Sequence, residues 1–103
     1  MNYAEFVNEL NITMGTGVPD LDHHTLSLAS ESGELAGKVL KQLYRGQHYA
    51  NEEYISELGD ILFHLQALCN YFNISLLELA QHNQIKLEDR LQRGVVCGDG
   101  DNR

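Results

Sequence analysis

The chain has 103 residues, a formal net charge of -8 at pH 7 and a hydrophobic content of 43%. This length suits one domain, and the hydrophobic content is ordinary for a globular protein, which argues against disorder. The negative charge disfavours non-specific binding to DNA or RNA and would repel a free triphosphate. A nucleotide substrate would therefore require a metal ion and locally placed cations, and a domain this small would benefit from oligomerisation.

The N-terminal half is predicted to form two helices. The first covers about residues 3–12 and ends before a stretch rich in glycine, Gly15 to Pro19, which breaks any helix. The second begins at Asp20 or Asp22 and continues to about residue 44, where Gly46 supplies a C-terminal stop.

The C-terminal half is predicted to form two more helices and a tail. Asn51 is expected as the N-cap of a helix over residues 51–72. A capping box that starts at Ser75 opens the fourth helix, which ends near Arg93. Residues 94–103 are expected to form a loop-like tail, and no segment predicts a convincing strand. The sequence thus predicts a single all-α domain over residues 1–103, built as a helical bundle of four main helices.

No signal peptide or membrane span is expected. Residues 1–10 have neither a basic region nor an apolar run. The longest apolar stretch, residues 61–69, is broken by His64 and Gln66 and cannot span a bilayer. The two cysteines, Cys69 and Cys97, are far apart in the sequence, so we expect a cytoplasmic protein with reduced thiols and no membrane partner.

Four carboxylates occur as two helical pairs, Glu31 with Glu34 and Glu57 with Asp60. The spacing within each pair places both side chains on one helix face, where like charges repel. A cation between the two helices would remove this conflict. Hard divalent cations prefer carboxylate oxygens, and magnesium usually reaches substrate phosphates as well. The pattern predicts a magnesium-dependent enzyme that acts on a phosphorylated substrate, with these four residues as metal ligands.

Helical periodicity places the acids beside the apolar faces of the second and third helices. Packing these apolar faces together would bring the acidic edges close to each other. On another flank of the second helix, Ser30, Gly33 and Gly37 form a strip of small residues. Glycine costs helix stability, so this strip predicts the close approach of another helix.

The fourth helix carries an amide within its apolar line. Asn83 falls among leucines, and Lys86 and Arg90 follow it at three and seven residues. A buried amide needs hydrogen-bond partners. Together the three side chains could present donors to phosphate oxygens.

Other polar side chains have simpler readings. His64 follows Asp60 by one turn, so it either orients that carboxylate or is a satisfied histidine at the edge of the core. Lys38 and Lys41 are read as solvated helix residues.

These motifs resemble the signature of the all-α nucleoside triphosphate pyrophosphohydrolases, and the chain is similar to the short, single-domain MazG-like proteins. The resemblance rests on Glu-x-x-Glu at residues 31–34, Glu-x-x-Asp at residues 57–60 and Asn-x-x-Lys-x-x-x-Arg at residues 83–90. It covers about residues 21–93. One departure is that Phe63 and His64 stand where family members often have tryptophan and tyrosine, a region tied to base recognition.

The resemblance implies hydrolysis of a nucleoside triphosphate between its α and β phosphates, which yields a monophosphate and pyrophosphate. The substrate would be a deoxynucleotide rather than a nucleic-acid polymer, and the role would be housekeeping of the nucleotide pool. The protein would assemble as a homo-oligomer, a dimer or a tetramer, with sites near subunit contacts.

The resemblance also assigns roles to individual side chains. Mg²⁺, or Mn²⁺ in its place, would be held by Glu31, Glu34, Glu57 and Asp60. Glu34 is the candidate base, and Lys86 and Arg90 would stabilise the leaving pyrophosphate. The implied substrate contacts are Asn83, Lys86, Arg90, His64 and Arg103.

Three alternatives remain open. A phosphoribosyl-ATP pyrophosphohydrolase shares the fold and the chemistry. A non-catalytic helical interaction module would tolerate neutral replacement of Glu34 or Asp60. A carboxylate-bridged di-iron bundle requires Glu-x-x-His pairs, which the sequence lacks at both acidic pairs, so this class ranks lowest.

Overall fold

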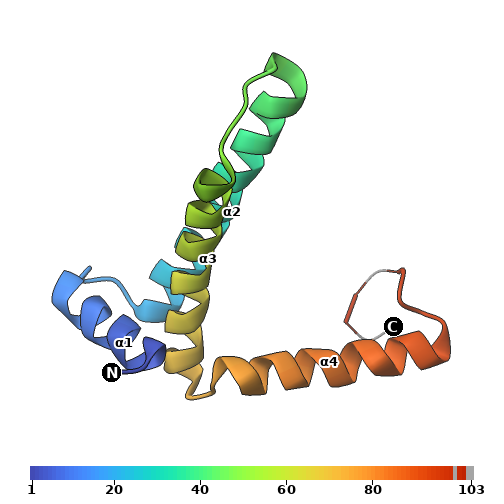
Figure 1. Cartoon of the computed structure of the whole chain (residues 1–103). Coiled ribbons are helices and arrows are strands. Elements are labelled where there is room, and N and C mark those ends of the chain that lie inside the picture. Colours follow the sequence, from blue (N-terminus) through green and yellow to red (C-terminus); the bar gives the residue numbers. More distant parts are fainter. Residues whose placement is uncertain (99, 102–103) are drawn as a thin grey trace.

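The computed structural model describes residues 1–98 and 100–101. Four helices follow one another along the chain, and the described residues form no strand: α1 (Tyr3–Met14), α2 (Asp20–Arg45), α3 (Asn51–Phe72) and α4 (Leu76–Arg93). α2 and α3 lie side by side as a long hairpin, α1 packs against α3, and α4 leads away from the hairpin (Figure 1). The predicted all-α fold and its four helices are confirmed.

Local hydrogen bonds explain most of the helix ends. Asn2 Oδ1 accepts from the Glu5 N–H at 2.8 Å and begins α1. The capping box that opens α4 is present, because Ser75 Oγ accepts from the Glu78 N–H and Glu78 Oε1 accepts from the Ser75 N–H. Gly46 ends α2 with φ of 65°, a left-handed conformation that glycine adopts without strain.

Two predicted boundaries were wrong. Asn51 is not the N-cap of α3, because Ala50 occupies that position and the Glu53 carboxylate accepts from the Ala50 N–H at 3.0 Å. Asn51 is the first residue inside the helix. α1 also continues to Met14, beyond the expected end at residue 12.

The hydrophobic core within one chain is small. Among the described residues, only Val7, Ala67 and Cys69 are buried hydrophobic side chains. Val7 and Ala67 line the region where α1 packs across α3, and there Asn70 Nδ2 donates to the Ala4 carbonyl at 3.0 Å. Cys69 and Cys97 are both free thiols, the first buried and the second exposed.

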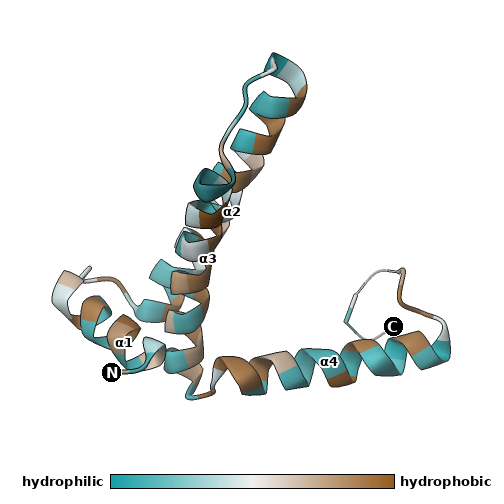
Figure 2. Ribbon diagram, in the orientation of Figure 1, coloured by the Kyte–Doolittle hydropathy of each residue, from teal (hydrophilic) through white to brown (hydrophobic). Residues whose placement is uncertain are grey.

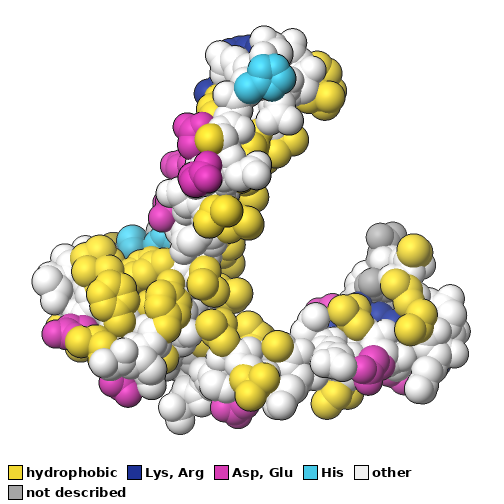
Figure 3. All heavy atoms as spheres, viewed as in Figure 1, with side chains coloured by type: hydrophobic (Ala, Val, Ile, Leu, Met, Phe, Trp, Pro, Cys, Tyr) yellow, Lys and Arg dark blue, Asp and Glu magenta, His cyan; other side chains and the backbone are white. Residues whose placement is uncertain are grey.

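The contact between α2 and α3 is more polar than predicted. The buried side chains of this hairpin include His24, Glu57 and Gln66. The apolar faces were expected to meet, yet Val39 and Leu58 are each about half exposed, at 51% and 53%. Glu57 therefore faces inward, whereas Glu34 and Asp60 are exposed. Hydrophobic residues occur along both helices of the hairpin (Figure 2), and many of their atoms are exposed on the face shown in Figure 3.

The strip of small residues on α2 meets no helix of the same chain. A Cβ atom added at Gly33 or Gly37 would contact nothing within 4 Å. The predicted close approach of another helix is therefore wrong within a single chain.

The four helices do not close into a compact bundle. The radius of gyration is 16.7 Å, against about 13 Å for a compact chain of this length. α4 contacts α3 near the connection between them and leaves most of its length without a neighbouring helix (Figure 1). None of the described helices is both long and apolar enough to cross a bilayer.

Candidate metal and phosphate site

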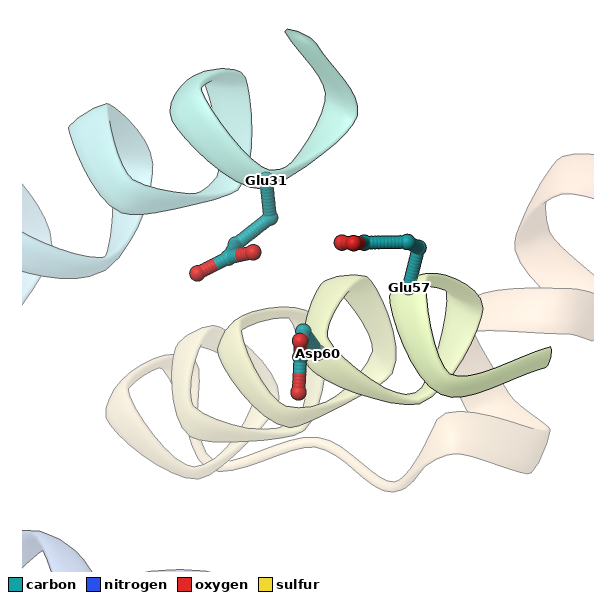
Figure 4. Close-up of side chains that lie close together, drawn as sticks. All are labelled: Glu31, Glu57 and Asp60. Carbon is teal, nitrogen blue, oxygen red and sulfur yellow. The ribbon is translucent and has the colours of Figure 1, made fainter. Parts of the chain in front are cut away.

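Three of the four predicted metal-binding carboxylates meet between α2 and α3. Glu31 comes from α2, and Glu57 and Asp60 come from one face of α3 (Figure 4). One oxygen from each carboxylate lies within 4.8 Å of the others. The three-residue spacing places Glu57 and Asp60 one turn apart on the same face, so both can turn toward α2.

Two carboxylate oxygens in this group are buried without a hydrogen-bond partner in the described chain, Oε2 of Glu31 and Oε2 of Glu57. A buried polar atom without a partner is unfavourable, and a charged one more so. The pKa of Glu31 is raised, first because the carboxylate is desolvated and then because Glu34, Asp60 and Glu57 lie nearby. The one ion pair of the group, from Lys38, reaches the other oxygen of Glu57 and leaves these two oxygens unpaired among the described residues.

The donor set suits a hard divalent cation. Magnesium takes oxygen ligands in octahedral geometry, which places neighbouring ligand oxygens about 3 to 4.2 Å apart. The three carboxylate oxygens lie within 4.8 Å of one another, slightly farther apart than this range. Small side-chain rotations would therefore bring all three to coordination distance of one ion. Asp60 is exposed and leaves one side open, where water or substrate phosphate can complete the coordination.

Glu34 lies beside this group but outside it. It is one turn beyond Glu31 on α2, and it is exposed. Its side chain is within hydrogen-bonding reach of Glu31 and contributes to the raised pKa of that residue. Glu34 as a metal ligand or base remains a prediction.

Lys38 was read as solvated, and this reading was wrong. Its Nζ lies 3.0 Å from Glu57 Oε1 and 5.5 Å from the centre of the Tyr49 ring. The hydrogen bond to Glu57 raises the pKa of Lys38, so the ammonium group stays charged. The available signal was spacing, because Lys38 lies one turn beyond Glu34 on the same face of α2.

A second polar cluster links three helices beside the acids. His24 is fully buried; its Nε2 lies 2.8 Å from Asn11 Oδ1 and its Nδ1 lies 3.0 Å from His64 Nδ1. An amide oxygen only accepts, so His24 donates from Nε2 and accepts the His64 Nδ1–H. Burial lowers the pKa of both histidines. The nearby His23 lowers the pKa of His24 further, and His24 and His23 lower that of His64.

This arrangement favours the reading of His64 as a satisfied histidine at the edge of the core. The buried position of His24 was not foreseen, because His23 and His24 stand together near the start of α2 and the sequence does not show which of them turns inward. A substrate contact by His64 remains a prediction.

The predicted phosphate-binding cations converge on the C-terminal tail. Lys86 Nζ lies 3.2 Å from Asp101 Oδ1, and Arg90 Nη2 donates to the Asp101 carbonyl at 2.8 Å and to Oδ1 at 3.2 Å. Arg90 is only 4% exposed. Hydrogen bonds from the two cations lower the pKa of Asp101. The Asp101 carboxylate thus stands where oxygens of a phosphate could bind.

The other predicted substrate contacts are placed differently. Asn83 is exposed, so its predicted burial was wrong; it lines a shallow groove with Leu65 and Leu76 near the start of α4. Arg103 lies outside the described residues. Within one chain, Lys86 and Arg90 belong to the helix that leads away from the acidic cluster (Figure 1).

The fold and the site define an all-helical protein that gathers carboxylates from two neighbouring helices at one point. The chain belongs to the MazG nucleotide pyrophosphohydrolase domain family, whose model matches residues 21–95. It is 36% identical over 90 residues to the "Gene 37 protein" of Mycobacterium phage L5, which covers 84% of this chain and 79% of that protein. No solved structure matches. The predicted family is confirmed, and it implies a nucleotide pyrophosphohydrolase that depends on a divalent metal.

Proposed function

We propose that this protein is a magnesium-dependent nucleoside triphosphate pyrophosphohydrolase that cuts between the α and β phosphates. The observation that carries the proposal is the pair of buried, unpartnered oxygens on Glu31 and Glu57 within a three-carboxylate group. We further propose deoxynucleoside triphosphates as substrates, Mn²⁺ as a substitute metal, a homo-oligomeric assembly in the cytoplasm and a role in nucleotide-pool housekeeping.

Different residues of the chain have different roles in the proposed reaction. A divalent cation held by Glu31, Glu57 and Asp60 would neutralise phosphate charge and make the phosphorus more electrophilic. Glu34, exposed beside this group, takes the proton of the attacking water. The water oxygen bonds to the α-phosphorus, the bond to the bridging oxygen breaks, and its electron pair leaves on pyrophosphate. The ion pair with Lys38 holds Glu57 in its inward position.

Product analysis tests the reaction directly. The purified protein is incubated with ribo- and deoxynucleoside triphosphates and with phosphoribosyl-ATP, each with magnesium and with a chelator. We expect monophosphate and pyrophosphate only with magnesium. Diphosphate plus phosphate would show that another bond is cut, and absence of turnover with every triphosphate would refute the proposal.

Matched variants test the residues. Glu34→Gln should lower kcat by about 10²–10⁴-fold, the usual contribution of a general base. Glu52→Gln is the control, because Glu52 is an exposed acid in the first turn of α3, away from the carboxylate group. A binding module without catalysis would show equal behaviour of both variants and no magnesium-linked increase in Tm.

A further inference from the structure

The carboxylate group of the hairpin needs a positive side chain besides a divalent metal if it is to bind phosphate. Four acids gather at or beside the point where α2 meets α3, namely Glu31, Glu34, Glu57 and Asp60. One divalent ion leaves this group negative, and the phosphates of a nucleotide would add further negative charge. Phosphate oxygens bind where charged N–H donors are already in place.

Lys38 is the cation of the hairpin that contacts this group. Its Nζ lies 3.0 Å from Glu57 Oε1, and no other Lys or Arg among the described residues forms an ion pair with the four acids. The next cations along α2, Lys41 and Arg45, are exposed and lie farther toward the loop. The cations of α4 pair with the tail instead.

The ion pair leaves both partners able to bind something else. An ammonium group has three N–H donors, and Glu57 accepts one of them. The Lys38 side chain keeps 23% of its surface exposed, so its other donors can reach a ligand. Oε2 of Glu57 is buried without a partner among the described residues. Sites with two metal ions bind one phosphoryl group between cations about 3.5–4 Å apart, and Lys38 can take the role of the second cation.

The loop between α2 and α3 holds the ammonium group in this position. The centre of the Tyr49 ring lies 5.5 Å from Lys38 Nζ, within the range of a cation–π contact. Tyr49 is itself held, because its hydroxyl donates to Gln47 Oε1 at 2.9 Å and its ring meets the Tyr54 ring edge-on at 6.0 Å. A lysine side chain is flexible, and holding it in place before the ligand arrives reduces the entropy lost on binding.

The position of Lys38 also gives the phosphate chain a direction along the hairpin. On α2, Lys38 lies about 10 Å beyond Glu31 toward the loop, at 1.5 Å per residue. On α3, which begins at the loop, Glu57 comes before Asp60. The positive charge therefore lies on the loop side of the carboxylate group, and α1 packs near the other end of the hairpin (Figure 1).

We propose that Lys38 is a substrate-binding residue that donates to oxygens of the leaving pyrophosphate while it keeps its ion pair with Glu57. The pyrophosphate half of the substrate lies on the loop side of the carboxylates, where the ammonium group stabilises the negative charge that develops on it. The inference rests on the proposed function for the identity of the substrate, and on the contacts with Glu57 and Tyr49 for the position of the cation.

Calorimetry with two probes separates phosphate binding from metal binding. Magnesium is titrated first, and inorganic pyrophosphate is then titrated with free magnesium in excess. Lys38→Met removes the ammonium group at nearly constant side-chain length. We expect pyrophosphate to bind about 10–100-fold more weakly, whereas magnesium binds at least as tightly, because Glu57 loses a competing cation.

The control is Lys41→Met, an exposed lysine on the same helix, which should match the wild type with both probes. Unchanged pyrophosphate affinity in Lys38→Met would overturn the inference, as would magnesium and pyrophosphate affinities that fall together. A residue that only supported the fold or held Glu57 would lower both. Lys38→Gln replaces Lys38→Met if that variant does not fold, and a wild-type protein that does not bind pyrophosphate would also overturn the inference.

Restoring the charge tests the ammonium group itself. In a Cys97→Ser background, Lys38→Cys is alkylated with 2-bromoethylamine, which rebuilds a charged amine of lysine length, or with iodoacetamide, which leaves a neutral amide. Cys69 is only 2% exposed and should stay unmodified. We expect tight pyrophosphate binding only after the first treatment, and equally weak binding after both would overturn the inference. Binding of pyrophosphate that depends on Lys38, without hydrolysis of any triphosphate, would instead refute only the proposed function.

Discussion

Neutralising Glu31 should stabilise the metal-free protein while removing its function. One oxygen from each of Glu31, Glu57 and Asp60 lies within 4.8 Å of the other two. At an effective dielectric constant of about 20, two unit charges at that distance repel by about 3.5 kcal/mol. The Lys38 ion pair and the exposure of Asp60 reduce this repulsion. We therefore expect Glu31→Gln to add about 1–2 kcal/mol in chelator, roughly 5–15 °C in Tm for a chain of this size.

The same variant should lose the magnesium response. Wild-type Tm should rise with magnesium, because an ion held by the folded carboxylate group stabilises the folded state, whereas Glu31→Gln should show little rise and no hydrolysis. The folded-state pKa of Glu31 is raised, so its ionisation destabilises the fold as pH rises through that pKa. The difference between variant and wild type should therefore shrink toward pH 4. A lower Tm for Glu31→Gln in chelator, or a change equal to that of Glu52→Gln, would refute the reasoning.

Three further results are expected. Lys38→Met should lower the metal-free Tm, because it leaves the buried Glu57 carboxylate without a cation. The magnesium-induced rise in Tm should then grow, and an unchanged rise would contradict this. Burial lowers the pKa of His24 and His64, so their contribution to stability is complete above about pH 6.5 and is lost as pH falls. The urea midpoint should drop from pH 7.5 to 5.5, and less steeply in His64→Gln. Asp101→Asn should tighten pyrophosphate binding in calorimetry, because a neutral amide competes less for the cations of α4; weaker binding would mean that the tail helps to hold phosphate.

The sequence predicted the local structure well because the signals are local. The glycine after α2 and the capping box before α4 act within one turn, and the structure places both helix ends there. The carboxylate pairs were also readable, since their spacing fixes a shared helix face. Asn51 was wrongly predicted as the N-cap of α3. Ala50 holds that position, and the Glu53 side chain accepts a hydrogen bond from the Ala50 N–H at the start of the helix.

Packing was less predictable, because it depends on which face each helix turns toward its neighbour. The apolar periodicity of α2 and α3 indicated a hydrophobic contact between the two helices, yet Glu57 and His24 are buried in the structure. Nor does the periodicity of α4 show whether its partner is its own hairpin or another copy. The ion pair of Lys38 was missed for the same reason, because its partner Glu57 lies on the other helix and the pairing depends on how the two helices face each other.

The scarcity of buried apolar side chains also shapes the thermal behaviour of the protein. The heat-capacity change of unfolding scales with the apolar area released to water, about 12–15 cal/mol/K per residue in ordinary domains. Val7, Ala67 and Cys69 form the small core found in the described residues, so a dilute single chain should fall well below that range. Its stability curve should be broad and flat, and calorimetry at rising protein concentration should reveal a growing heat-capacity step as copies cover each other's apolar surface.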